Sequence, residues 1–155
     1  MTARQLCTFY LDDLFLGVDV AHVQEVVQTD HVTRVPLADS TVAGIINLRG
    51  QIVAAVNLRE CLQRAASTST RLPLSLVVCL KGATVSLFVD RMGDVLDLDE
   101  SGFLPTPEIV DRKVARLLNG AYKLPQDLLL VLDTQRVLTH VKNLHSGARG
   151  PAKSQ

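Results

Sequence analysis

The feature that most constrains this chain is the spacing of its apolar segments. They are short, rich in Val, Leu and Ile, and interrupted by Gly, Asp, Asn or Pro at intervals of roughly ten residues. Residues 84–89 alternate polar and apolar side chains, as a strand with one buried face does. No apolar run approaches the ~20 residues that a membrane helix requires. The pattern therefore predicts an all-β fold, a barrel or a sandwich, with a few short helices.

Turn residues predict three hairpins. Residues 42–46 and 52–56 flank the sequence Asn47-Leu48-Arg49-Gly50, which suits a type I turn with Arg49 at its exposed tip. Lys81 and Gly82 join residues 76–80 to residues 84–89, where glycine relieves the backbone. A third hairpin is expected from residues 117–122 and 128–132.

Three short helices are expected between the strands. Asp19 can cap a helix over residues 20–27, whose outward side chains would be His22, Gln24 and Glu25. Asn57 precedes a second helix over residues 58–64, and a third begins near Thr134. The small polar residues 65–71 indicate a connecting loop, and residues 145–155 indicate a disordered tail.

Composition argues for one domain that binds another protein. The 155 residues suit a single folding unit, and sixteen basic side chains balance sixteen acidic ones. A nucleic-acid interface is disfavoured, because it needs clustered Lys and Arg and this chain also lacks Trp for base stacking. Three widely spaced cysteines predict neither a disulfide framework nor a metal site.

Catalytic motifs and targeting signals are not recognisable in the sequence. No nucleophile elbow, phosphate loop or calcium loop is present, so we expect no enzyme activity, no cofactor and no bound metal. The N-terminus has no secretory signal pattern, which favours a cytoplasmic protein.

One stretch of the sequence carries a resemblance to a known family. Residues 44–53 read GIINLRGQIV and residues 56–59 read VNLR, and this string closely resembles the central motif of CheW-like coupling domains. Further segments follow in the family's order: residues 15–20, 23–27, 32–36, 87–90, 94–96 and 129–133. The likeness covers most of residues 5–142. Ala54 and Asn57 depart from the Pro and Asp that are common in the family.

The resemblance implies a fold of two SH3-like five-stranded β-barrels. We expect a CheW-like domain over residues 1–144, in which one subdomain takes residues 5–64 with 130–144 and the other takes residues 72–129. Such proteins are non-catalytic adaptors of bacterial chemotaxis. They bridge the cytoplasmic helices of a chemoreceptor to the regulatory domain of a sensor histidine kinase.

The resemblance also suggests two contact surfaces. Val20, Val23 and Glu25 would contact the kinase, although both valines could equally be core residues. The receptor surface would comprise Gly44, Asn47, Arg49, Ser75, Val85 and Val95. Arg49 would offer a bidentate contact to a carboxylate and Asn47 would fix its turn, while Gly44 would either admit a receptor helix or mark a bulge.

Three alternatives stay open at this point. The first is a CheW-like regulator of a different chemosensory pathway, such as surface motility. The second, disfavoured by the neutral charge, is a β-barrel nucleic-acid-binding module. A small enzyme is the least favoured, and a closed pocket with convergent titratable groups would be its sign.

Overall fold

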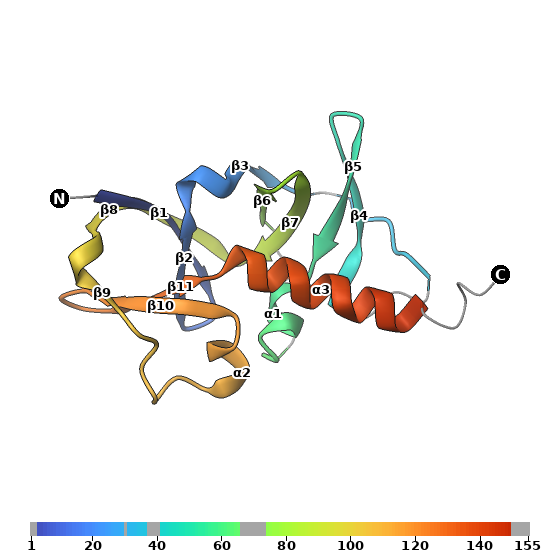
Figure 1. Cartoon of the computed structure of the whole chain (residues 1–155). Helices are drawn as coiled ribbons and strands as arrows, with labels where there is room; N and C mark the ends of the chain where they lie inside the picture. The colour runs from blue at the N-terminus through green and yellow to red at the C-terminus, as the bar shows by residue number, and fades with distance from the viewer. Residues whose placement is uncertain (1–2, 30, 37–40, 66–73, 150–155) are drawn as a thin grey trace.

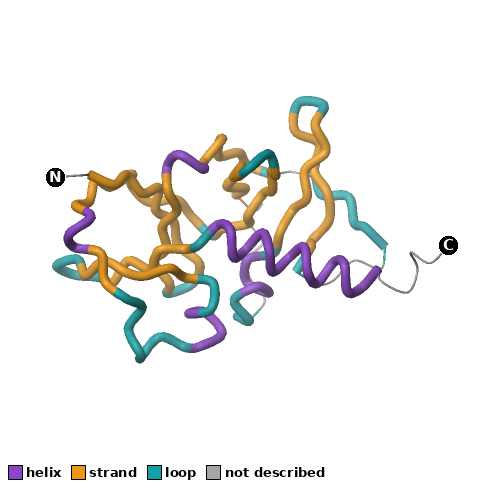
Figure 2. The backbone as a smooth tube through the Cα atoms, viewed as in Figure 1, coloured by secondary structure: helices purple, strands orange, loops and turns teal. Residues whose placement is uncertain are grey.

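The described part of the chain forms two β-sheets together with several helical segments (Figure 1). The computed structural model describes residues 3–29, 31–36, 41–65 and 74–149, with only the backbone for residues 142–149. Strands dominate both halves of the molecule, as the tube in Figure 2 shows. The expected all-β class with two barrel subdomains is confirmed.

The first barrel contains six strands in the order β8-β1-β2-β11-β10-β9. Their bounds are β1 Ala3–Leu11, β2 Leu14–Asp19, β8 Arg91–Asp99, β9 Phe103–Leu104, β10 Leu118–Lys123 and β11 Leu128–Leu132. Neighbouring strands are antiparallel except β2 and β11, which are parallel. A 3-10 turn, η2 (Glu100–Gly102), joins the two edge strands β8 and β9, so the chain closes the sheet on itself.

The second barrel contains five strands in the order β3-β6-β7-β5-β4. Their bounds are β3 Val23–Gln28, β4 Val42–Leu48, β5 Gln51–Val56, β6 Leu74–Leu80 and β7 Ala83–Val89. Here β5 and β7 form the parallel pair. Thr33 exchanges both backbone hydrogen bonds with Ile45, at 2.9 and 2.7 Å, so the segment after β3 closes this sheet against β4.

The two barrels divide the chain differently from the predicted subdomains. Strands between residues 23 and 89 form the second barrel, whereas residues 3–19 and 91–132 form the first. The predicted division into 5–64 with 130–144 and 72–129 is therefore wrong. Polar composition around residue 68 indicated a boundary, but the chain crosses between barrels at η1 (Val20–His22) and at Asp90.

Strand residues alternate between three apolar clusters. Leu129 and Val131 of β11 face the interior of the first barrel, while Leu130 and Leu132 face the opposite way. The interior of the second barrel forms around Ile46, Val53 and Ala55. The largest cluster takes residues from both barrels and all three helices, and we call it the shared layer; it includes Phe9, Leu16, Val56, Leu58, Leu87, Val114, Leu130 and Val137. Both barrels therefore bury side chains in one common apolar layer.

Three α-helices cover the shared layer: α1 Leu58–Cys61, α2 Arg112–Ala115 and α3 Thr134–Arg149. In Figure 1, α3 leaves the first barrel after β11 and runs across to the second barrel. The prediction of a helix near Thr134 is confirmed, but the predicted tail is wrong for residues 145–149, which continue that helix. Residues 150–155 lie outside the described residues.

The predicted helix over residues 20–27 is wrong beyond its first turn. Asp19 does cap η1, accepting a hydrogen bond from the Ala21 amide at 2.9 Å. From Val23 onward the chain is strand β3, whose residues alternate between half-buried and exposed. Valines suit a pleated strand better than a helix, because their branched side chains restrict χ1.

All three predicted hairpins are present, with one change of turn type. Leu48 pairs with Gln51, so Arg49 and Gly50 alone form the turn, at φ 54° and 86°. Two consecutive residues with positive φ define a type I′ turn rather than the predicted type I. Lys81 and Gly82 form the same turn between β6 and β7, at φ 52° and 81°.

Candidate functional site

The tip of the β4–β5 hairpin carries a bidentate ion pair. Arg49 donates from Nη1 to Glu25 Oε2 at 2.6 Å and from Nη2 to Oε1 at 2.7 Å. Figure 1 shows this hairpin projecting from the body of the molecule. The Arg49 side chain is 75% exposed, whereas Glu25 on β3 is 15% exposed. The structure thus brings together one residue from each of the two predicted contact surfaces.

The local sequence explains how the hairpin presents Arg49. Asn47 Oδ1 accepts a hydrogen bond from the Gly50 amide at 2.8 Å, which confirms its predicted role of fixing the turn. Gly50 supplies the positive φ that the turn requires at that position. Arg49 itself takes a positive φ, and this directs its side chain from the tip of the hairpin back to β3.

Gly44 has a structural explanation. Pairing between β4 and β5 shifts register between Val42 and Gly44, which marks the bulge that the sequence left as one of two readings. Gly44 is buried with φ 154°, and a Cβ atom there would lie 2.2 Å from the Thr33 carbonyl oxygen. The close approach at this glycine is therefore made by the chain's own closing segment.

Val20 and Val23 are neither fully buried nor fully exposed. Both are half-buried and pack against the shared layer, so part of each side chain is core. Val20 also lines an open hollow of about 470 Å³, together with Arg4, Asp19 and Glu100 among other residues. Val26, on the same strand as Val23, is more exposed than either, at 41%.

Three residues of the predicted receptor surface do not form a common groove floor. Ser75 on β6 is fully buried, and its hydroxyl is hydrogen-bonded to the hydroxyl of Thr29. Val85 on β7 is half-buried against the shared layer, whereas Val95 on β8 is 56% exposed. The placement of Ser75 on that surface is wrong, because β6 turns this residue to the opposite face from Leu76 and Val78, which join the shared layer.

Ile52 is an exposed apolar residue that the sequence reasoning missed. It lies on β5 opposite Asn47 and is 60% exposed. The signal was available in the alternation of β5, because Val53 and Ala55 point into the second barrel and Ile52 must then point outward. Ile52 thus adds an exposed apolar side chain to the projecting hairpin.

Neither a cluster of metal ligands nor a membrane-spanning helix is found among the described residues. Within the described residues, no three His, Cys, Asp or Glu side chains come together as ligands for a metal ion. None of the helices in the described part of the chain combines the length and apolarity that a membrane crossing requires. What the projecting hairpin offers is a charge-paired guanidinium at its tip and the exposed side chain of Ile52 on β5.

Comparisons with known proteins agree with this architecture. The chemotaxis protein CheW of Thermotoga maritima is 28% identical over 137 residues, which cover 88% of this chain and 89% of that protein. CheW of Rhizobium meliloti is 31% identical over 116 residues, covering 73% and 75%. The crystal structure of the scaffolding protein TtCheW from Thermoanaerobacter tengcongensis superimposes with a TM-score of 0.77 at 24% identity, over 84% of this chain and 89% of that one, and so shows the fold.

The family assignment rests on the extent of the match. The family model described as the CheW-like domain matches residues 5–142, which include every strand from β2 to β11 and most of β1. The projecting hairpin, its turn and the Glu25 strand all lie within the matched region. The chain belongs to the CheW-like domain family.

Proposed function

We propose that this protein is a non-catalytic adaptor of bacterial chemotaxis, which holds the regulatory domain of a sensor histidine kinase beside the cytoplasmic helices of a chemoreceptor. The observation that carries the proposal is the Arg49–Glu25 pair, which joins Arg49 on the projecting hairpin to Glu25 on β3, one residue from each of the two predicted contact surfaces. The curated relatives are named chemotaxis proteins and the solved one a scaffolding protein, which supports the same role. Both partners act inside the cell, so we place the protein in the cytoplasm.

The proposed surfaces meet at the ion pair. On the kinase side, Val20 and Val23 expose part of their side chains next to Glu25. On the receptor side, Asn47 holds the turn that presents Arg49, and Val95 offers an exposed apolar side chain on another strand. A guanidinium has five N–H donors, so Arg49 can keep Glu25 and still donate to a carboxylate of a partner.

Pairwise contacts of this size predict modest affinity. A few exposed side chains cannot supply the large apolar core of an obligate interface. Many tethered copies in a membrane-associated array would raise the effective concentration and stabilise the assembly. A CheW-like regulator of a different chemosensory pathway would use the same surfaces, and the genes adjoining this one would identify the pathway.

The test is capture of each partner by purified protein. The wild-type chain should retain a cognate receptor cytoplasmic fragment and a cognate kinase regulatory domain. Arg49→Ala should weaken receptor capture by about tenfold, which is the loss of ~1.4 kcal/mol expected for one good charged contact.

Lys81→Ala is the matched control for that variant. Lys81 occupies the same position of the same turn type, with φ 52° against 54° for Arg49, so alanine imposes similar backbone strain in both. Capture by Lys81→Ala should match the wild type. If wild-type protein retains neither partner, or if both variants lose capture equally, the proposed function is wrong.

A further inference from the structure

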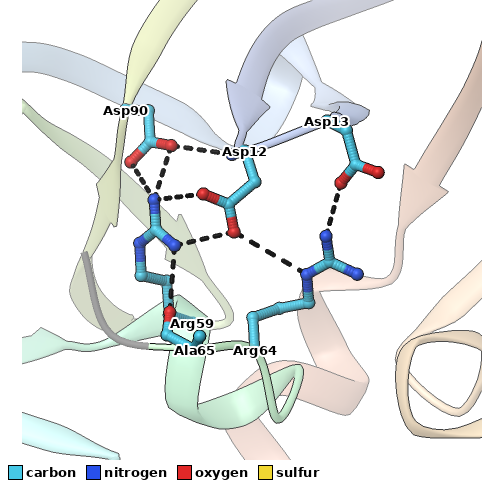
Figure 3. A network of polar contacts seen from close by, with 6 residues as sticks. All are labelled: Asp12, Asp13, Arg59, Arg64, Ala65 and Asp90. Carbon is cyan, nitrogen blue, oxygen red and sulfur yellow. Dashed lines mark hydrogen bonds and ion pairs between the residues drawn. The ribbon is translucent and has the colours of Figure 1, made fainter. Parts of the chain in front are cut away.

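An ionic network joins the two barrels at one edge of the shared layer (Figure 3). Its centre is Arg59 on α1, which follows the last residue of β5 in the second barrel. Asp12 and Asp13 form the turn between β1 and β2 of the first barrel, and Asp90 is the single residue between β7 and β8. Arg64 completes the network from the segment after α1.

Arg59 uses both terminal nitrogens of its guanidinium. Nη2 donates to the two carboxylate oxygens of Asp90 at 2.9 and 2.7 Å, and Nη1 donates to Asp12 Oδ2 at 2.7 Å and to the Ala65 carbonyl at 3.0 Å. The side chain is 11% exposed, against 36% for Asp12 and 34% for Asp90. Burial lowers the pKa of Arg59, but hydrogen bonds and charge from Asp12 and Asp90 raise it by more, so the guanidinium stays ionised.

The Asp90 carboxylate and the Asp90 amide are both held by backbone groups of the β1–β2 hairpin. The Asp12 amide donates to Asp90 Oδ2 at 2.7 Å, and the Asp90 amide donates to the Tyr10 carbonyl at 3.0 Å. These two hydrogen bonds connect the β1–β2 hairpin to Asp90, where the chain crosses between barrels, and neither bond involves Arg59. Arg59 then ties both of them to α1 of the second barrel.

Apolar packing and this network contribute differently to the contact between the barrels. Burial of the shared layer holds the barrels together, but the hydrophobic effect is non-directional. Charged hydrogen bonds from a planar guanidinium are directional. Arg59 contacts the Asp12 carboxylate through two different nitrogens, Nη1 to Oδ2 and Nη2 to Oδ1, each at 2.7 Å, and such a two-point contact fixes an orientation. The network lies where the two barrels meet, so it acts on the angle between them.

We propose that Arg59 is a positioning residue that sets the angle between the two barrels, and thereby the spacing of surfaces that lie on different barrels. The Arg49 hairpin and Val26 belong to the second barrel, whereas Val95 belongs to the first. The consequence for partner binding rests on the proposed adaptor function, but the angle itself does not.

The test measures barrel orientation directly, by residual dipolar couplings of backbone amides in the intact chain. Wild-type couplings from both barrels should fit one alignment frame. In Arg59→Gln each barrel should still fit its own frame, while one common frame should fail. Arg59→Lys should fail likewise, because an ammonium keeps the charge but not the planar fork; couplings restored by lysine would overturn the proposal.

Arg64→Gln is the control, since Arg64 is bound to Asp13, which is 81% exposed, and reaches Asp12 only at 3.8 Å. Its couplings should match the wild type. Asp12→Asn is a milder change, because it removes one charge from the Arg59–Asp12 contact and keeps Arg59. It tests the role of the network in barrel orientation even if Arg59→Gln does not fold. Unchanged couplings in Asp12→Asn or in a folded Arg59→Gln would overturn the proposal.

A capture assay with both partners separates this proposal from the adaptor function. Arg59→Gln should bind the receptor fragment and the kinase domain singly as the wild type does, but should retain less of the two together. Equal retention of both together would overturn the functional consequence. If wild-type protein binds neither partner, the adaptor function fails while the couplings still decide the role of Arg59.

Discussion

The two barrels share one strand order but are built from different parts of the chain. One continuous stretch, residues 23–89, forms the second barrel, whereas two separate stretches form the first. The series β8-β1-β2-β11-β10 in the first corresponds to β3-β6-β7-β5-β4 in the second, with the parallel pair in the same place. Gly120 and Gly44 follow a bulge at equivalent positions, both at φ 154°. The amides of Asp133 and Asn57 donate to the equivalent carbonyls of Leu117 and Thr41, at 2.8 and 2.7 Å.

The two barrels also differ in the turns and helices that follow equivalent strands. The second barrel joins β4 to β5 by a two-residue turn that projects Arg49, whereas the first joins β10 to β11 through Leu124 and Asp127, hydrogen-bonded to each other. Asp133 caps a sixteen-residue helix, while Asn57 precedes one of four residues. The projecting two-residue turn that carries Arg49 therefore has no counterpart between β10 and β11.

The glycines give the largest expected effect. Alanine at Gly44 would place its Cβ 2.2 Å from the Thr33 carbonyl oxygen, and alanine at Gly120 would place it 2.2 Å from Phe103 Cζ. Each substitution should lower the free energy of unfolding by about 3 kcal/mol, measured by urea denaturation. If Gly44→Ala lowered the free energy of unfolding much less than Gly120→Ala, the contacts that the chain makes against these two glycines would not be equivalent.

The polar interior of the second barrel should give the next effect. Ser75→Ala leaves the buried Thr29 hydroxyl without its partner and should cost about 1–2 kcal/mol. Ser86 is also buried, and its hydroxyl has no hydrogen-bond partner among the residues that the structure describes. Ser86→Ala should therefore cost nothing or stabilise the protein. Equal losses in the two variants would contradict this assignment.

The helix caps offer a direct comparison of the two barrels. Asp133 Oδ1 accepts a hydrogen bond from the Arg136 amide at 3.1 Å, whereas the Asn57 side chain makes no capping hydrogen bond. Asp133→Ala should cost about 1 kcal/mol and Asn57→Ala less than about 0.5 kcal/mol, by the same denaturation measurement. The reverse ranking would mean that Asn57 stabilises the fold in another way.

A small effect is expected at the ion pair of the candidate site. Arg49 is largely exposed, so a double-mutant cycle with Arg49→Ala and Glu25→Ala should give a coupling energy of about 0.5–1 kcal/mol. High salt should reduce it. A coupling above about 2 kcal/mol would indicate that the pair holds the hairpin in place as part of the fold.

Local signals in the sequence were sufficient for the hairpins and the site loop. Asn and Gly flanking Leu48 and Arg49 predicted both the turn and its tip, and alternation predicted β7. The GIINLRGQIV string, with the further segments that follow in the family's order, indicated the family over most of residues 5–142, and the family model matches those residues. These features are determined by residues that are adjacent in the chain, so a local sequence pattern predicts them.

Features that depend on distant segments could not be predicted in this way. The valines after Asp19 fit a helical stripe and a strand equally well, and pairing with β6 decided between them. The Arg59 network joins residues that are far apart in the chain, and nothing local marks Asp12 or Asp90 as its partners. The assignment of each strand to a barrel also depends on pairing between distant segments, because β2 and β11 become neighbours only when the chain has folded.

The pairing of Leu16 with Leu130 has a consequence for synthesis on the ribosome. Once Val89 has emerged, every strand of the second barrel is available and that barrel can close. The amino-terminal hairpin, although made first, has to wait for almost the whole chain before its partner β11 exists. Until β11 has been synthesised, the leucines and phenylalanines of the β1–β2 hairpin are exposed to water. The nascent protein is therefore most prone to aggregate through this hairpin.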